Sequence, residues 1–246
     1  MKNLLLILVF FSQFGFSQGF EKGNELYRKN DFAGAAAAYE SVLKTGKVSA
    51  GLYFNLGNAY YKQNKVAPAI YNYEKALLLN PGDKEIETNL EFAQNMRIDD
   101  IKELPQVGFS KFIRNFTANF HYDTWAWISI CLSVLFLALF CGYYFTRSAA
   151  YKRVFFGAMI LGLLLIIISV ASAAYEKQTY ENERPAIVFA PVISIKSEPS
   201  QDASDAFQLH EGTKVEIVET LENWRKIEIA DGNTGWIEQN VIRELK

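Results

Sequence analysis

The chain has 246 residues, half of them hydrophobic, and its 25 basic and 27 acidic side chains leave a net charge of −2. A charge so close to zero gives no indication of a nucleic acid partner. The two cysteines, Cys131 and Cys141, lie ten residues apart in one apolar segment, where they cannot pair with each other. The sequence therefore carries no disulfide framework.

The chain begins with a pattern typical of exported proteins. Lys2 precedes an apolar run, and the small residues Gly15 and Ser17 follow it. A basic start, a short apolar stretch and small residues together predict a signal peptide over residues 1–17, cut before Gln18. The alternative is an uncleaved anchor, which would leave the following residues on the same outer side.

Residues 18–101 repeat themselves with a shift of 34 residues, which places Gly23-Asn24 on Gly57-Asn58 and Tyr39 on Tyr73. This period and these residue types resemble the tetratricopeptide repeat, an all-α solenoid of paired helices. We predict repeats at about 19–47 and 50–83 and a terminal helix over 84–98. Two repeats are close to the minimum for stability, so we expect the array to pack against something else.

The resemblance implies a protein-binding groove lined by the first helix of each repeat. By family position, the groove residues are Phe20, Asn24, Tyr27, Arg28, Phe54, Asn58, Tyr61 and Lys62. The two asparagines could hold the backbone of an extended peptide. Alternatively, they only cap local backbone groups. The family's carboxylate-binding variant has lysine where this chain has Phe20 and Phe54, so capture of a C-terminal carboxylate is not expected.

Residues 102–123 carry phenylalanines at helical spacing, among them Phe112, Phe116 and Phe120, with Lys111 and Arg114 between them. This pattern predicts an amphipathic helix lying in a lipid interface. The alternative is a soluble helix that packs against the repeats.

Two apolar segments, residues 124–145 and 154–175, contain no charged side chain. Each is long enough to cross a bilayer as a helix, and neither shows the polar face of a soluble core helix. The loop between them, residues 146–153, is basic. Since short basic loops stay in the cytoplasm, we predict that both flanking regions lie outside it. The absence of ionisable residues from the spans argues against a transporter.

After a polar linker, residues 176–184, the apolar pattern changes to a period of two. This alternation and the turn Asp231-Gly232-Asn233 predict a small all-β barrel of five or six strands over residues 185–246. Glu211-Gly212-Thr213, Trp224 and Gly235-Trp236-Ile237 resemble the bacterial SH3-like domain. The two tryptophans are candidates for a ligand surface or for the core, and residues 199–205 are expected to form an exposed recognition loop.

No chemistry-bearing constellation is present in the sequence. His121 and His210 lie far apart without neighbouring cysteines, and no phosphate loop, nucleophile motif or zinc motif occurs. We therefore expect no catalytic residues, no metal and no cofactor, and a protein that is not an enzyme.

The complete order of parts describes a multidomain membrane protein, and it resembles the BatE-type proteins of the Bacteroides aerotolerance operon. That resemblance implies an inner-membrane location and von Willebrand A-domain membrane proteins as partners. It also implies an indirect link to a MoxR-type ATPase and a role in oxygen or envelope stress. Two functions follow as hypotheses: a membrane-tethered scaffold for partner proteins, or a cell-wall sensor whose SH3-like domain binds peptidoglycan peptides.

Overall fold

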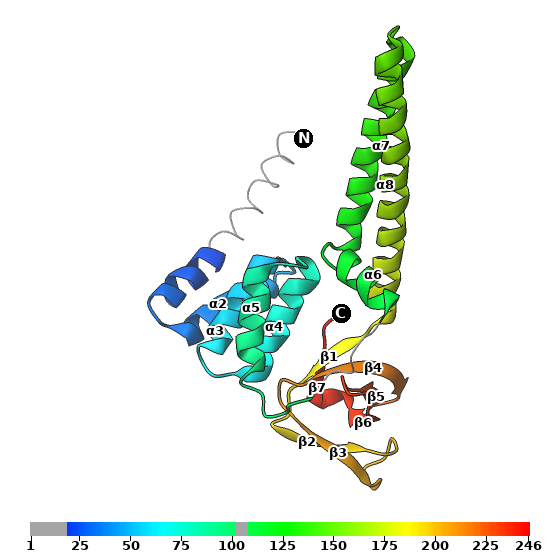
Figure 1. The fold of residues 1–246 in the computed structure, drawn as a ribbon. Helices are drawn as coiled ribbons and strands as arrows, with labels where there is room; N and C mark the ends of the chain where they lie inside the picture. Colours follow the sequence, from blue (N-terminus) through cyan, green and yellow to red (C-terminus); the bar gives the residue numbers. More distant parts are fainter. Residues whose placement is uncertain (1–18, 102–107) are drawn as a thin grey trace, which may run out of the picture. The chain divides into compact units, whose positions relative to one another are not determined.

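The computed structural model describes residues 19–101 and 108–246 (Figure 1). The chain divides into two compact units. One combines the residues up to Pro105 with Arg184–Lys246, and the other is Gln106–Glu183. The predicted signal peptide, residues 1–17, lies outside the described residues, as does the start of the predicted interfacial segment.

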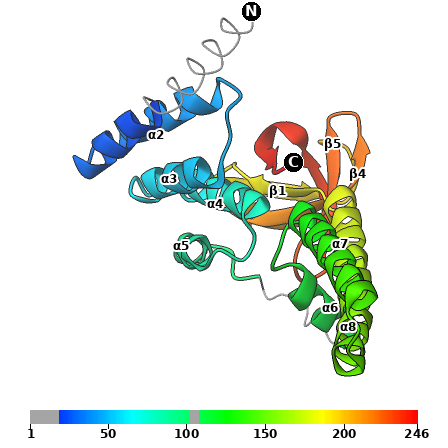
Figure 2. The same ribbon diagram turned by 90° about the horizontal axis from the view of Figure 1, so that it is seen from above.

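Residues 19–94 of the first unit form five successive helices, and these helices are called the helical array (Figure 2). The first is described over residues 19–28, and the others are α2 (Phe32–Leu43), α3 (Ala50–Tyr61), α4 (Val66–Leu79) and α5 (Lys84–Gln94). Side-chain oxygens of Asp31, Ser49 and Asp83 accept backbone N–H groups at the starts of α2, α3 and α5. Such caps satisfy amides that have no partner within the helix.

The repeat seen in the sequence is also present in the backbone. Asn30 and Asn64, 34 residues apart, have φ angles of 61° and 58° and each connects two helices. Asparagine tolerates this left-handed conformation better than most residues. The turn after α4 uses Gly82, with a φ of 75°, directly after Pro81.

The glycines of the two repeats allow close helix contact. A Cβ atom on Gly57 would lie 2.7 Å from the ring of Tyr73, and one on Gly23 would lie 2.3 Å from the ring of Tyr39. Tyr39 and Tyr73 are among the largest fully buried side chains. Each tyrosine therefore fills space that its partner glycine leaves open.

We expect Gly57→Ala to lower the free energy of unfolding by about 1–3 kcal/mol, because the added methyl group collides with Tyr73. Gly51→Ala, on the same helix, is the matched control, since its Cβ would meet no atom within 4 Å. Alanine favours the helix there by up to about 1 kcal/mol. Thermal unfolding of the two purified variants in detergent measures the difference, and equal midpoints would contradict the packing described.

Seven strands form the sheet domain, residues 185–246, with the antiparallel order β3-β2-β6-β5-β4-β1-β7 (Figure 1). They are β1 (Pro185–Val188), β2 (Val192–Lys196), β3 (Asp205–His210), β4 (Lys214–Leu221), β5 (Trp224–Glu228), β6 (Thr234–Glu238) and β7 (Ile242–Glu244). The predicted turn at Asp231-Gly232-Asn233 joins β5 to β6, with Gly232 at a φ of 86°.

The sheet has seven strands, more than the five or six predicted. Phe207 and Leu209 alternate with polar residues on β3 and contribute to the core of the sheet domain, so a period-two signal was present. The predicted recognition loop, residues 199–205, leads into this strand.

The second unit contains α6 (Phe109–Thr117), α7 (Tyr122–Phe145) and α8 (Ala149–Asn182). Both α7 and α8 are long and apolar enough to cross a membrane, and they lie side by side (Figure 1). A Cβ on Gly142 would lie 2.9 Å from the ring of Phe155, and the Ser169 hydroxyl donates to the Trp125 carbonyl at 2.8 Å. Small residues thus bring the two helices together, as expected for helices in lipid.

Helix α8 continues without interruption to Asn182, so most of the segment predicted as a polar linker is helical. Its 34 residues span about 51 Å at 1.5 Å per residue, more than a hydrocarbon core requires.

At the start of α7, Trp125 is buried and its Nε1 donates to the Thr117 carbonyl at 2.9 Å. It therefore joins α6 to α7.

Candidate functional site

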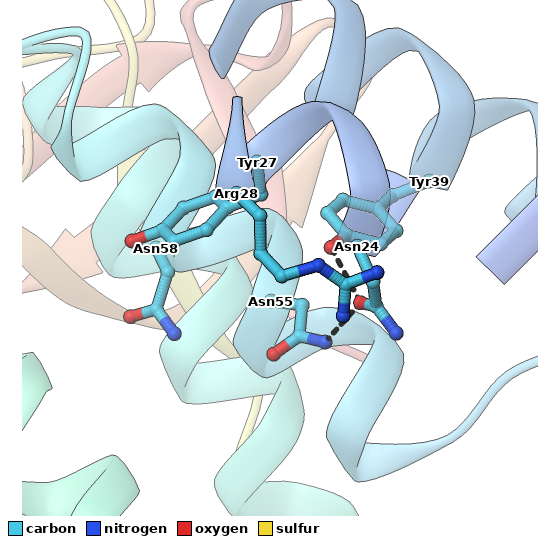
Figure 3. A pocket seen from close by; sticks show the side chains of 6 residues that line it. All are labelled: Asn24, Tyr27, Arg28, Tyr39, Asn55 and Asn58. Atoms are coloured by element: carbon cyan, nitrogen blue, oxygen red, sulfur yellow. Dashed lines mark hydrogen bonds between the residues drawn. The ribbon is translucent and has the colours of Figure 1, made fainter. Parts of the chain in front are cut away.

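A pocket of about 320 Å³ opens on the helical array (Figure 3). Its lining comes from the first three helices and consists of Asn24, Tyr27, Arg28, Tyr39, Asn55 and Asn58. Three amides, two phenols and a guanidinium make this a polar site that is rich in hydrogen-bond donors.

Hydrogen bonds inside the array fix the orientation of the pocket amides. The Tyr39 hydroxyl donates to Asn24 Oδ1 at 2.8 Å, and Asn55 Nδ2 donates to the same oxygen at 3.0 Å (Figure 3). One repeat later, the Tyr73 hydroxyl donates to Asn58 Oδ1 at 2.7 Å. Since Asn24 Oδ1 already accepts two hydrogen bonds and Asn58 Oδ1 accepts one, the N–H donors are the main groups that these amides offer a ligand.

The two tyrosines are well suited to hold the amides. Burial raises the pKa of Tyr39 to about 12 and also raises the pKa of Tyr73, so both phenols keep the proton that they donate. Behind them, the ring of Phe20 lies 5.9 Å from Tyr39 and that of Phe54 lies 6.0 Å from Tyr73, both at 49°. The two repeats thus contain the same arrangement of phenylalanine, tyrosine and asparagine.

Arg28 gives the pocket a positive charge. Glu25, one turn earlier on the same helix, forms an ion pair with Lys29 at 2.6 Å. Within residues 19–101 and 108–246, no carboxylate forms an ion pair with Arg28. A guanidinium beside amide N–H donors favours a ligand that brings carbonyl oxygens or a carboxylate.

Two family models match this chain. Residues 20–84 match the tetratricopeptide repeat, and residues 193–244 match the bacterial SH3 domain. The chain carries tetratricopeptide repeats and a bacterial SH3 domain. No curated protein matches it.

The tetratricopeptide pocket gathers half of the residues predicted for the groove. Asn24, Tyr27, Arg28 and Asn58 line it, whereas Phe20 and Phe54 support the tyrosines, and Tyr61 and Lys62 are not among the lining residues. The oxygens of Asn24 and Asn58 are held by tyrosines from other helices, in place of the local backbone groups considered as the alternative.

Sequence analysis did not identify Tyr39 and Asn55 as pocket residues. Asn55 precedes Asn58 by three positions on α3, which places both on one helix face. Tyr39 follows Asn24 by 15 residues, the same spacing that separates Tyr73 from Asn58. The shared face of α3 could have identified Asn55, and the repeated spacing of 15 residues could have identified Tyr39.

In the SH3 domain, the two tryptophans have different environments. Trp236 is only 9% exposed and lies opposite Lys196 on β2 and Lys226 on β5, while the next residue, Ile237, points into the core. Trp224 is partly exposed at the start of β5. Trp224 is therefore the more accessible of the two candidate ligand residues.

The loop between β2 and β3 is held against the SH3 domain. Lys196 pairs with Asp205 at 2.8 Å and donates to the Ala203 carbonyl, and Gln201 donates to Glu238 on β6 at 3.1 Å.

Nowhere in the described ranges do three or more histidine, cysteine or acidic side chains gather as a metal site would require.

Proposed function

We propose that the protein is a membrane-anchored, non-enzymatic adaptor whose tetratricopeptide pocket binds an extended segment of a partner protein. The observation that carries the proposal is the repeated tyrosine–asparagine bond, which leaves amide N–H groups of Asn24 and Asn58 available one repeat apart. Peptide carbonyl oxygens are the acceptors that such donors suit. The preset amides lose little freedom on binding, which favours affinity.

The charge of the pocket narrows the proposal to a partner segment that carries acidic side chains. Arg28 supplies the cation at the pocket, and exposed Lys62 lies at the equivalent position of the second repeat. Carboxylates next to a peptide backbone would satisfy both the guanidinium and the amides. Opposite charge would also speed association with the partner.

For location, we propose a two-pass inner-membrane protein with both modules in the periplasm. The two apolar helices, the basic residues between them and the resemblance to BatE-type proteins support this proposal. On that basis, von Willebrand A-domain membrane proteins are the proposed partners, with an indirect link to a MoxR-type ATPase. The proposed setting is tolerance of oxygen or envelope stress.

A photo-crosslinking residue in place of Tyr27 tests the proposal in native membranes. We expect it to capture a discrete partner protein, and Arg28→Glu to reduce capture at least tenfold through charge repulsion. Arg28→Lys should keep most of the capture, because it keeps the charge. The control position is exposed Ser41 on α2, which is not among the pocket residues. Equal capture at both positions would contradict the proposed site.

The second candidate function is binding of peptidoglycan peptides by the SH3 domain. The partly exposed Trp224 on a domain of the bacterial SH3 family favours it. The same photo-crosslinker at position 224 separates the two candidates. Muramidase-sensitive material captured at position 224, with nothing captured at position 27, would favour the cell-wall function over the adaptor.

A further inference from the structure

We infer that the tetratricopeptide repeats and the SH3 domain form a single folded body into which the membrane hairpin is inserted. In this body the SH3 domain covers a face of α4, beside the helices of the array that also pack against it. The inference does not depend on what the pocket binds.

The hydrophobic core of the second repeat includes side chains from the sheet domain, residues 185–246, which contains the SH3 match and is called the SH3 domain here. Ile187 and Leu245, 0% and 1% exposed, belong to the same buried cluster as Ile70 and Tyr73 of α4. They do not belong to the cluster that forms the core of the SH3 domain itself. Nearby, the rings of Phe189 and Tyr71 lie 5.8 Å apart at 73°. The core of the array is therefore completed by residues that follow the membrane hairpin in the chain.

Polar groups of α4 are satisfied across the same contact. Glu74 is only 8% exposed, and Lys214 of β4 pairs with its carboxylate at 2.7 Å. Lys75 donates to the Leu245 carbonyl at 2.8 Å, and the Tyr71 hydroxyl donates to the Glu244 carbonyl at 3.3 Å. A buried carboxylate without a cation is costly, and Lys214 supplies the cation beside Glu74.

Asp99, in the segment after α5, also forms hydrogen bonds with the SH3 domain. Asp99 accepts hydrogen bonds from the His210 backbone N–H at 2.7 Å and the Thr213 hydroxyl at 2.6 Å, and its other oxygen lies 2.6 Å from His210 Nδ1. Burial acts to raise the pKa of Asp99, but the hydrogen bonds from Thr213 and His210 outweigh it and hold the pKa below its usual range. Asp99 is thus held as a carboxylate between the two modules.

The turn between β3 and β4 approaches α4 closely. Gly212 there has a φ of 85°, and a Cβ on it would lie 3.0 Å from side-chain atoms of both Ile70 and Val66. A larger residue would have to adopt a strained backbone and displace the α4 side chains. The match between this turn and α4 indicates a specific contact.

The contact explains how a short array is stable and limits how the chain crosses a membrane. Two repeats leave one helix face uncovered, and the SH3 domain covers it. Because a buried interface cannot form through a bilayer, residues 19–101 and 184–246 must share one compartment. This constraint is independent of the charge of the connecting loop. The contact uses α4 and residues 97–99, none of which line the pocket, so the pocket stays open.

A zero-length carbodiimide crosslinker tests the inference on the full-length protein in membranes, because it converts an existing ion pair into an amide bond. We expect a link between Lys214 and Glu74, identified by mass spectrometry in the monomer band. Lys214→Arg keeps the ion pair but removes the reactive amine, so this link should disappear. The Lys29–Glu25 pair, at 2.6 Å within one helix, is the internal positive control.

Expressing the protein first in heavy and then in light medium in the same cells places both isotopes in one membrane, which distinguishes contacts within a chain from contacts between chains. A link that always joins peptides of the same isotope supports the single body. Links that join both isotopes would assign the contact to a second copy and overturn the inference. Absence of the Lys214–Glu74 link, while Lys29–Glu25 still forms, would also overturn it. Neither result bears on ligand capture at the pocket.

Discussion

Replacing Leu245 with aspartate is expected to loosen the tetratricopeptide repeats, although the residue belongs to the other module. The side chain is 1% exposed in the cluster built around α4. Placing a carboxylate there removes an apolar contact and buries a charge, so we expect a loss of about 4 kcal/mol or more. Hydrogen exchange of the full-length protein in detergent measures the effect: protection of α3 and α4 amides should fall by two to three powers of ten, about 3–4 kcal/mol.

Leu221→Asp is the matched control, because Leu221 is 48% exposed on β4 of the same domain. A surface substitution of this kind is expected to change stability by no more than about 0.5 kcal/mol. If Leu245→Asp loosened only the SH3 strands and left α3 and α4 fully protected, the two modules would fold separately.

The second large effect concerns the sides of the membrane on which the parts lie. With Cys131 and Cys141 replaced by alanine, Ser148→Cys should react with an impermeant maleimide only after the membrane is opened. Lys62→Cys and Gln201→Cys should both react in intact spheroplasts. All three positions are exposed, so accessibility of the side chain itself does not limit the reaction.

Labelling of Ser148→Cys should increase at least tenfold when the membrane is opened. Labelling of the other two variants should be about the same before and after opening. If one of Lys62→Cys and Gln201→Cys reacted in intact spheroplasts and the other only after opening, both the predicted topology and the single body would be contradicted. Labelling of both only after opening would place the modules in the cytoplasm and reverse the predicted orientation.

The features that could be predicted best from the sequence are determined by residues that lie close together along the chain. The spans need only composition and length, and the repeats need only a 34-residue period carried by residues such as Gly57 and Asn58. Helix caps at Asp31, Ser49 and Asp83 follow the same local rule. The family of each module could therefore be predicted, and the matches to the tetratricopeptide repeat and the bacterial SH3 domain confirm it.

What sequence missed depends on residues that are distant along the chain. Tyr39 enters the pocket because three helices converge there, and the pattern of its own helix does not mark it. The contact between Lys75 and Leu245 joins residues separated by 170 positions. An apolar residue such as Leu245 resembles an ordinary strand residue until the partner helix is known, so its place in the core of the array could not be predicted.

The position of Leu245 also sets an order of events during biosynthesis. The helices of the array are translated first, but the residues that complete their core are translated only after α7 and α8. The array must therefore wait, incompletely packed, while the ribosome delivers α7, α8 and the strands that follow. Chains that stop early would leave α4 exposed to proteases, so only a fully translated chain would be protected.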